Sequence, residues 1–311
     1  MEKVFYKTSV FKGMALILGA FFLIRVWLAC SLNLTQDEAY YWMWSRNIDW
    51  CYYDHPGMIA WLEYAGTQLT GMYTAFFVRL PVIFLSLGVS IAAYITSYDL
   101  FGSHERAAAT AVLMNIIPVF FIGGIMAITD IPLTFFWILS ALFLIRLIKT
   151  KNPVYFYLLA LSLAGALYSK YTTMFLIFGV VLFFVLSPNR CTWLKNPHLW
   201  FSALFAFLLL TPMIWWNYHH DWISYRFLVN RGAIPQSFSL TKLLDYFFSY
   251  HGAQFLLLSP LIYIAVILTL LRVAKRWLSE RDDGVLACLA LSVPALLYFS
   301  YLSFRTRTHP N

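Results

Sequence analysis

The acidic and aromatic side chains that could do chemistry gather in residues 34–62, LTQDEAYYWMWSRNIDWCYYDHPGMIAWL. Thr35 and Glu38 have the S/T-x-x-E spacing of a capping box, in which each side chain bonds the other residue's backbone amide at a helix start. Asp37 would then stand in the first helical turn, where the helix dipole favours a negative charge. We therefore expect Asp37 to be ionised and to point at solvent or at a substrate.

Other candidates follow further along the chain, at Asp130, Lys170 and the run His219, His220, Asp221. Asp130 lies just before Pro132 and either caps a helix or binds a substrate. Lys170 either reaches the membrane surface from the end of a span or meets an anion. The histidine run could ligate a divalent ion, but adjacent histidines point in different directions on regular backbone and the spacing matches no recognised metal pattern.

The composition places all of these residues in a membrane protein. The chain has 311 residues, of which 61% are hydrophobic and only 12% charged, far from the balance of a soluble domain. We expect an all-α polytopic protein. We attribute the net charge of +8 to basic residues in cytoplasmic loops, where Lys and Arg collect in membrane proteins. No basic run has the spacing expected for binding nucleic acid.

Nine apolar segments approach the length of about 20 residues that a membrane span requires. They lie near 14–32, 80–98, 107–125, 131–148, 154–168, 171–187, 199–216, 255–272 and 285–302. The long runs 107–148 and 154–187 are each divided into two spans, because Asp130 and Lys170 would be expensive in mid-membrane. We interpret the first segment as an uncleaved span, whose Arg25 pairs with an outer-loop carboxylate or reaches the interface.

Orientation follows from the short loops. With the N-terminus inside, most basic residues fall in the cytoplasm: Lys3, Lys7, Lys12, Arg106, Arg146, Lys149, Lys151, Arg190, Lys195, Arg272, Lys275, Arg276 and Arg281. The candidate residues then share the outer face, in a first outer loop at about 33–79, a second at about 217–254 and two short turns. Met58, Leu62 and Leu69 repeat at helical spacing with Glu63 off that stripe, so we expect an amphipathic interfacial helix over 57–79.

The order of these motifs resembles the bacterial PMT-type glycosyltransferases, relatives of families 39 and 83 in the GT-C superfamily. These include protein O-mannosyltransferases and lipid A sugar transferases. The resemblance rests on Asp37-Glu38 after the first span, YYDHP at 52–56, TDIPL at 129–133, SKY at 169–171 and WNYHHDWISYRF at 216–227. Two departures are Gly57, where members often have a second proline, and the end of the chain at Asn311, where the family pattern would run on. We expect a C-terminally truncated member with a single GT-C-like transmembrane domain.

The resemblance implies transfer of a sugar, with inversion, from a polyprenyl-phosphate donor to a glycolipid of the lipid A type or to a protein. It implies that Asp37 and Asp130 are catalytic, with Asp37 as the base that takes the acceptor proton. Lys170 would stabilise the departing phosphate. Further contacts to donor phosphate or substrate would come from Glu38, His55, Tyr171, Arg226 and Arg231. His55 could equally bond within its own loop, and a divalent ion stays an open alternative.

Two rival readings remain. A multi-span transporter would also carry charged residues in its spans, but the halves of the chain show no repeat, and the acids lie in outer loops. An inactive fragment of a transferase is the other. We expect a bacterial plasma-membrane protein with its site facing the exterior or periplasm.

Overall fold

The computed structural model describes residues 9–232 and 240–303, and its regular elements there are helices. Within these ranges, five helices are long and apolar enough to cross a membrane. They are α1 (Ser9–Ser31), α4 (Ala75–Phe101), α7 (Asp130–Thr150), α11 (Pro197–His219) and α15 (Asp283–Leu302). The all-α multi-pass class is therefore confirmed. Lys3, Lys7, the 233–239 part of the second outer loop and the tail from residue 304 lie outside the described residues.

The other apolar segments form shorter or broken helices. These are α5 (His104–Ile116), α6 (Pro118–Gly123), α8 (Val154–Ser169), η2 (Tyr171–Thr173), α9 (Met174–Leu186), α13 (Leu240–Leu258) and α14 (Pro260–Glu280). Ile117 is extended between α5 and α6 because it precedes Pro118, which disfavours helical backbone at that position. The helix pair around Ser259 bends by 107° and counts at most as one further span. Five or six spans follow from helix length, and the count of nine stays a prediction.

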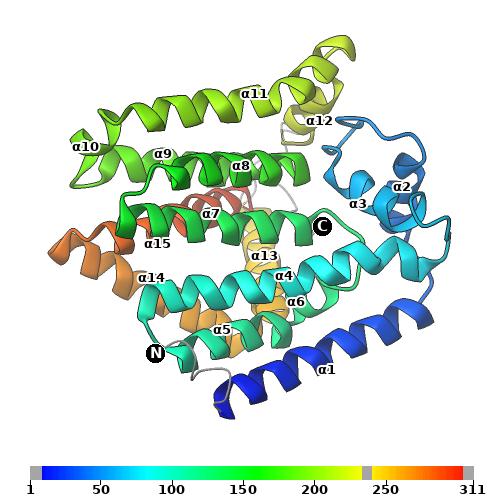
Figure 1. Cartoon of the computed structure of the whole chain (residues 1–311), viewed down its shortest axis with the longest axis horizontal. Helices are drawn as coiled ribbons and strands as arrows, with labels where there is room; N and C mark the ends of the chain where they lie inside the picture. The colour runs from blue at the N-terminus through cyan, green and yellow to red at the C-terminus, as the bar shows by residue number, and fades with distance from the viewer. Residues whose placement is uncertain (1–8, 233–239, 304–311) are drawn as a thin grey trace.

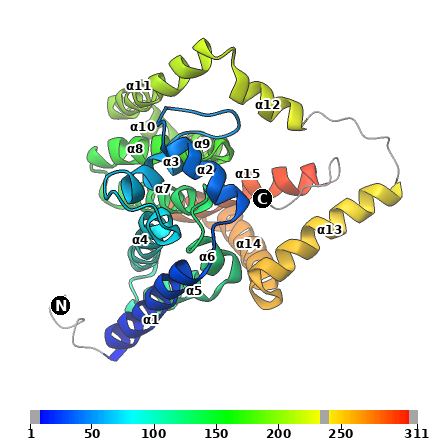
Figure 2. The same ribbon diagram turned by 90° about the vertical axis from the view of Figure 1, so that its right-hand side faces the viewer.

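The long helices lie side by side, and the connecting helices α2 (Gln36–Ser45), α3 (Met58–Thr67) and α12 (Ile223–Gly232) gather at one end of the bundle (Figure 1). We call this the α2–α3 end. Figure 2 looks onto it and shows α12 and α13 on the same side of α2 and α3, with α12 above and α13 below. The breaks that the sequence predicts are confirmed, because α7 begins at Asp130 and α8 ends at Ser169.

Three buried clusters hold the bundle together. The first joins α7, α8, α9 and α15 through residues such as Leu144 and Phe183. The second packs Tyr41 of α2 and Ile59 of α3 onto α4 and α7. The third packs Cys51 against α8 and α11. The last two clusters attach the first outer loop to the spans and so position its polar side chains.

Arg25 is buried inside α1 and bonds neutral groups of neighbouring helices. Its Nη1 donates to Asn115 Oδ1 at 2.6 Å, and Asn115 Nδ2 donates to Ser90 Oγ at 2.9 Å. Its Nη2 also reaches the Phe120 carbonyl at 3.4 Å, next to the break between α5 and α6. The described bonds of Arg25 thus do not include the outer-loop carboxylate that the sequence suggested. Arg25 instead links α1 to α5 and, through Asn115, to α4.

The helix expected over 57–79 is wrong in its length and its buried face. Helix α3 ends at Thr67, and Leu69 is 70% exposed. Glu63, expected on the polar face, is fully buried. The reason is tertiary: a Cβ at Gly66 would collide with the Phe77 carbonyl, so α3 approaches α4 closely and turns Glu63 inward.

Candidate active site

The capping box at the head of α2 forms as the sequence predicts. The Thr35 amide donates to Glu38 Oε2 at 2.9 Å, and the Glu38 amide donates to Thr35 Oγ1 at 3.4 Å. Asp37, between them in the first turn, is exposed. Glu38 thus belongs to the helix cap, and Asp37 faces the surroundings.

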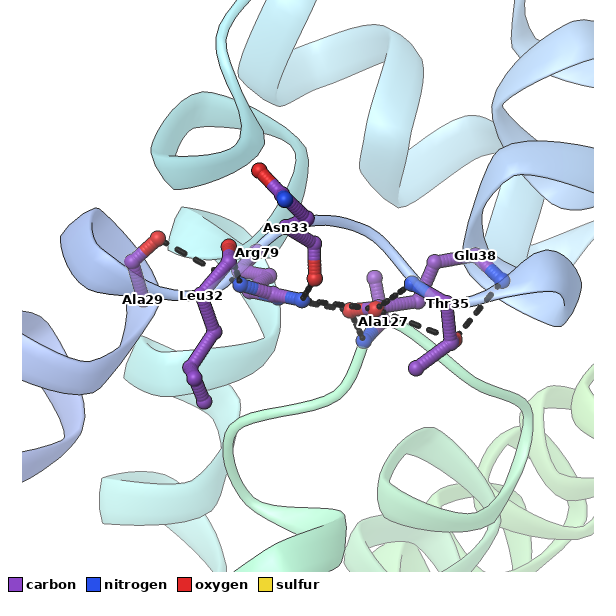
Figure 3. A network of polar contacts seen from close by, with 7 residues as sticks. All are labelled: Ala29, Leu32, Asn33, Thr35, Glu38, Arg79 and Ala127. Atoms are coloured by element: carbon purple, nitrogen blue, oxygen red, sulfur yellow. Dashed lines mark hydrogen bonds and ion pairs between the residues drawn. The ribbon is translucent and has the colours of Figure 1, made fainter.

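Glu38 is the centre of a buried polar network (Figure 3). Arg79 of α4 binds it with two hydrogen bonds, Nε to Oε1 at 2.7 Å and Nη2 to Oε2 at 2.8 Å. The same guanidinium donates to the carbonyls of Leu32 and Asn33, and the Ala127 amide donates to Glu38 Oε1 at 2.9 Å. The network therefore ties the end of α1, the head of α2, α4 and the segment before α7 to one point.

These contacts keep Glu38 ionised. Burial alone would raise its pKa, but the hydrogen bonds from Arg79 and from the amides of Thr35 and Ala127 outweigh burial and lower the pKa. Both carboxylate oxygens are engaged within the protein. The substrate contact expected of Glu38 stays a prediction, and its observed contacts fix the start of α2, on which Asp37 stands.

Asp130 and Lys170, 40 residues apart in sequence, meet at the α2–α3 end. Lys170 Nζ donates to Asp130 Oδ1 at 2.9 Å. The Asp130 side chain is 41% exposed and that of Lys170 is 17% exposed, so the pair is partly open to its surroundings. Asp130 is the first residue of α7, and Lys170 follows the last residue of α8 in extended backbone. Two adjacent helix ends thus bring an anion and a cation together.

Tyr41 of α2 is a further site residue, which was not among the candidates from the sequence. Its side chain is 8% exposed and packs near Trp44 and His55, with ring centroids 4.9 and 5.8 Å away. Burial raises its pKa, and the negative charges of Asp54, Asp37 and Asp130 raise it further.

Both burial and the neighbouring negative charges disfavour loss of the proton from the phenol. Tyr41 therefore stays protonated and can donate a hydrogen bond. A signal was available in the sequence, because Tyr41 stands four residues after Asp37 and so shares its helix face.

The remaining candidates are placed less centrally. Tyr171 is buried, and its hydroxyl lies 3.7 Å from Cys51 Sγ. His55 lies in the first outer loop beside Tyr41. Arg226 is exposed on α12, which is tied to that loop by Ser224 Oγ donating to the Tyr52 carbonyl at 2.6 Å. Arg231 belongs to α12, but its side chain lies outside the described residues.

The histidine run does not form a metal centre in the described ranges. His219 stacks on Trp215 and His220 stacks on Trp216, so the two rings diverge. Asp221 follows with positive φ, beyond the end of α11. Within residues 9–232 and 240–303, no three His, Cys, Asp or Glu side chains are placed to hold an ion.

Glu63 is a second buried carboxyl near the site. Its oxygens have no hydrogen-bond partner among the described residues. Burial, together with the charge of Glu38, raises its pKa to about 10. Glu63 is therefore a neutral acid at physiological pH, whereas its neighbour Glu38 is ionised.

Replacing Glu63 with Gln is expected to stabilise the protein at neutral pH. The folded state holds the Glu63 proton up to about pH 10, but the unfolded state releases it near pH 4.5, so folding loses stability as pH rises between these values. Gln has no such proton. At pH 8 we expect a net gain of roughly 2–4 kcal/mol in the free energy of unfolding, because each pH unit above the unfolded pKa costs Glu63 about 1.4 kcal/mol, while an unpaired Gln amide costs about 1–3 kcal/mol.

The measurement is denaturant unfolding of both proteins in detergent between pH 5 and pH 9. The gain should grow with pH. A gain that is equal at both ends of this range would contradict the assignment of a neutral Glu63. Gln68, which lies at the end of α3 and bonds Tyr73 on the surface, offers a control: Gln68→Glu should leave the pH dependence unchanged.

Together, the fold and the site define a class: an all-helical, multi-pass membrane protein with carboxylates and a lysine gathered at one end of its bundle. Residues 54–216 match the model of the dolichyl-phosphate-mannose-protein mannosyltransferase family. The chain belongs to this family of glycosyltransferases, which confirms the resemblance seen in its motifs.

A curated relative extends the similarity beyond the matched region. The chain is 24% identical over 305 residues to the lipid A galacturonosyltransferase RgtD of Rhizobium johnstonii. The aligned region covers 96% of this chain but 62% of the relative, so the chain spans less than two thirds of that protein's length. No solved structure matches the chain.

Proposed function

We propose that this chain is the transmembrane part of a glycosyltransferase that moves a sugar from a polyprenyl-phosphate donor to a lipid A-type glycolipid. Family membership supports a lipid-linked sugar donor, and the name of the relative supports the acceptor class. The observation that carries the proposal is the Asp130–Lys170 ion pair at the end of the bundle where the head of α2 presents exposed Asp37. A protein acceptor is the alternative within the same reaction class.

In the proposed reaction, Asp37 takes the proton from the acceptor hydroxyl as its oxygen attacks the anomeric carbon. The bond from that carbon to the phosphate oxygen breaks on the opposite face, which inverts the anomeric configuration. Negative charge grows on the departing phosphate, and Lys170 stabilises it. Asp130 holds the lysine in place, and Tyr41 can donate to a substrate oxygen from among the acids.

The proposed topology has nine spans, with the N-terminus inside and the site on the extracytoplasmic face. It treats the broken or shorter helices around α6, α8, α9 and α14 as crossings too. The basic residues support this orientation, because Arg106, Lys149 and Lys195 lie close to helix ends that alternate along the chain with those of the site residues. A single transmembrane domain with outer loops at about 33–79 and 217–254 belongs to the same proposal.

The test is transfer of radiolabelled sugar from a polyprenyl-phosphate donor to lipid A in proteoliposomes. Wild-type protein should label the lipid in proportion to time and enzyme. Uptake of solute by the same vesicles without any labelling of lipid would contradict the proposal and favour the transporter interpretation.

Replacing Lys170 with Gln is expected to lower kcat/KM for the donor about 10- to 100-fold, because Lys170 would stabilise the charge on the departing phosphate and a hydrogen bond to a charged group contributes about 1.5–3 kcal/mol. The KM for the acceptor should change little. Lys195→Gln is the matched control, since Lys195 is exposed near the start of α11, at the opposite end of the bundle. Equal effects of the two substitutions on kcat/KM for the donor would remove the phosphate role from Lys170.

A further inference from the structure

A groove lies between the C-terminal part of α11 and the loop that follows α2. Its volume is about 650 Å³, which falls in the range of small-ligand sites. Its wall is mostly aromatic, and its lining includes Asp49, Trp50, Trp215, Trp216, His219 and His220. Neither Asp37 nor the Asp130–Lys170 pair lines it, so the groove is separate from the candidate reaction centre.

The two histidines of the groove are held rigidly. The His219 ring stacks on Trp215 with centroids 3.6 Å apart, and the His220 ring stacks on Trp216 with centroids 3.8 Å apart. Nδ1 of His219 donates to the Trp215 carbonyl at 2.9 Å, and Nδ1 of His220 donates to the Trp216 carbonyl at 2.7 Å. In the neutral rings the proton is therefore on Nδ1, and each Nε2 can accept a hydrogen bond.

The groove adjoins the segment that carries Lys170. The Trp50 ring lies 6.2 Å from that of Tyr168, two residues before the lysine, and 5.6 Å from that of Trp61. Trp61 Nε1 in turn donates to the Asp49 carbonyl at 2.9 Å, which fixes the loop wall of the groove. Because tryptophans near the end of a span favour the membrane–water interface, a ligand here would lie at head-group depth.

The chemistry of the lining selects among head groups. Exposed indole faces attract C–H groups through the negative face of the ring. The Asp49 carboxylate and the two Nε2 atoms accept hydrogen bonds from hydroxyls. Among the described residues the lining has no lysine or arginine, so it favours the hydroxyl-bearing part of a head group over any phosphate that the head group carries. A pyranose has an apolar C–H face and several hydroxyls. It can therefore contact both the indole rings and the hydrogen-bond acceptors of the lining.

We propose that this groove binds the saccharide head group of the acceptor glycolipid. The proposal rests on the proposed function for the identity of the lipid, and it names the subsite that would hold the acceptor beside the reaction centre.

The experiment measures binding of lipid A to the purified chain in nanodiscs, with no sugar donor present. Trp215→Leu and His219→Ala are each expected to raise the Kd about tenfold, because they remove a stacking face or a fixed acceptor. Trp200→Leu is the matched control: Trp200 lies on the same helix at its other end and is 60% exposed, against 50% for Trp215. Its Kd should equal that of the wild type.

Phosphatidic acid, an anionic lipid without a sugar, is the second probe, and its binding should not respond to Trp215→Leu. Wild-type affinity for lipid A in Trp215→Leu, or equal losses for both lipids, would overturn the saccharide assignment. If binding of lipid A depends on Trp215 but the wild type transfers no sugar in proteoliposomes, the proposed reaction fails and the saccharide groove stands.

Discussion

Asp37→Asn is expected to lower kcat for sugar transfer by about 10²–10⁴-fold, the usual contribution of a general base. Asn has almost the same shape as Asp but cannot take a proton from the acceptor hydroxyl at neutral pH. Asp37 is exposed and the capping box is made by Thr35 and Glu38, so the helix start should survive the substitution. The assay is radiolabelled transfer in proteoliposomes, with thermal unfolding compared in detergent.

Asp282 offers a matched control for this prediction. It also stands at a helix start, where its side chain accepts a bond from the Val285 amide at 2.9 Å, but it lies at the head of α15, away from the candidate site. Asn caps helices as well as Asp, so Asp282→Asn should keep both stability and activity. If Asp37→Asn kept wild-type kcat, the base assignment would have to be abandoned.

Arg79→Met should have the largest effect on stability. The substitution leaves the fully buried Glu38 carboxylate without its cation, and breaking a buried pair in this way typically costs about 3–5 kcal/mol. Removing both partners, as in Glu38→Leu with Arg79→Met, should cost less than the sum of the single changes, because no unpaired charge is left behind. The measurement is denaturant unfolding in detergent of the wild type, the two single variants and the double variant. It gives the coupling energy between Glu38 and Arg79.

Arg146→Met is the comparison for this cycle. Arg146 pairs with Asp99 at 2.6 Å, but the two side chains are 36% and 21% exposed, and an ion pair open to water contributes about 0–1 kcal/mol. A loss at Arg79 no larger than the loss at Arg146 would show that the network in Figure 3 does not hold the site together. Activity should fall with stability in Arg79→Met, in contrast to Asp37→Asn.

The local features of the site could be predicted from sequence because they depend on near neighbours. The capping box needs only Thr35 and Glu38, three residues apart, and the ends of α7 and α8 follow from charges that interrupt apolar runs. The same local logic failed for α3. Its apolar stripe suggested one buried face, but the close approach of Gly66 to α4 decided another, with Glu63 inside.

By itself, the amino-acid sequence determined the helical membrane class, the motif order that marks the family, and the helix start that presents Asp37. Tertiary structure alone decided which charges meet, because Glu38 and Arg79 are 41 residues apart and Asp130 and Lys170 are 40 apart. Helix periodicity and caps arise from contacts three or four residues apart, which sequence displays directly. Ion pairs and grooves between helices depend on how whole elements pack, and a local pattern does not carry that information.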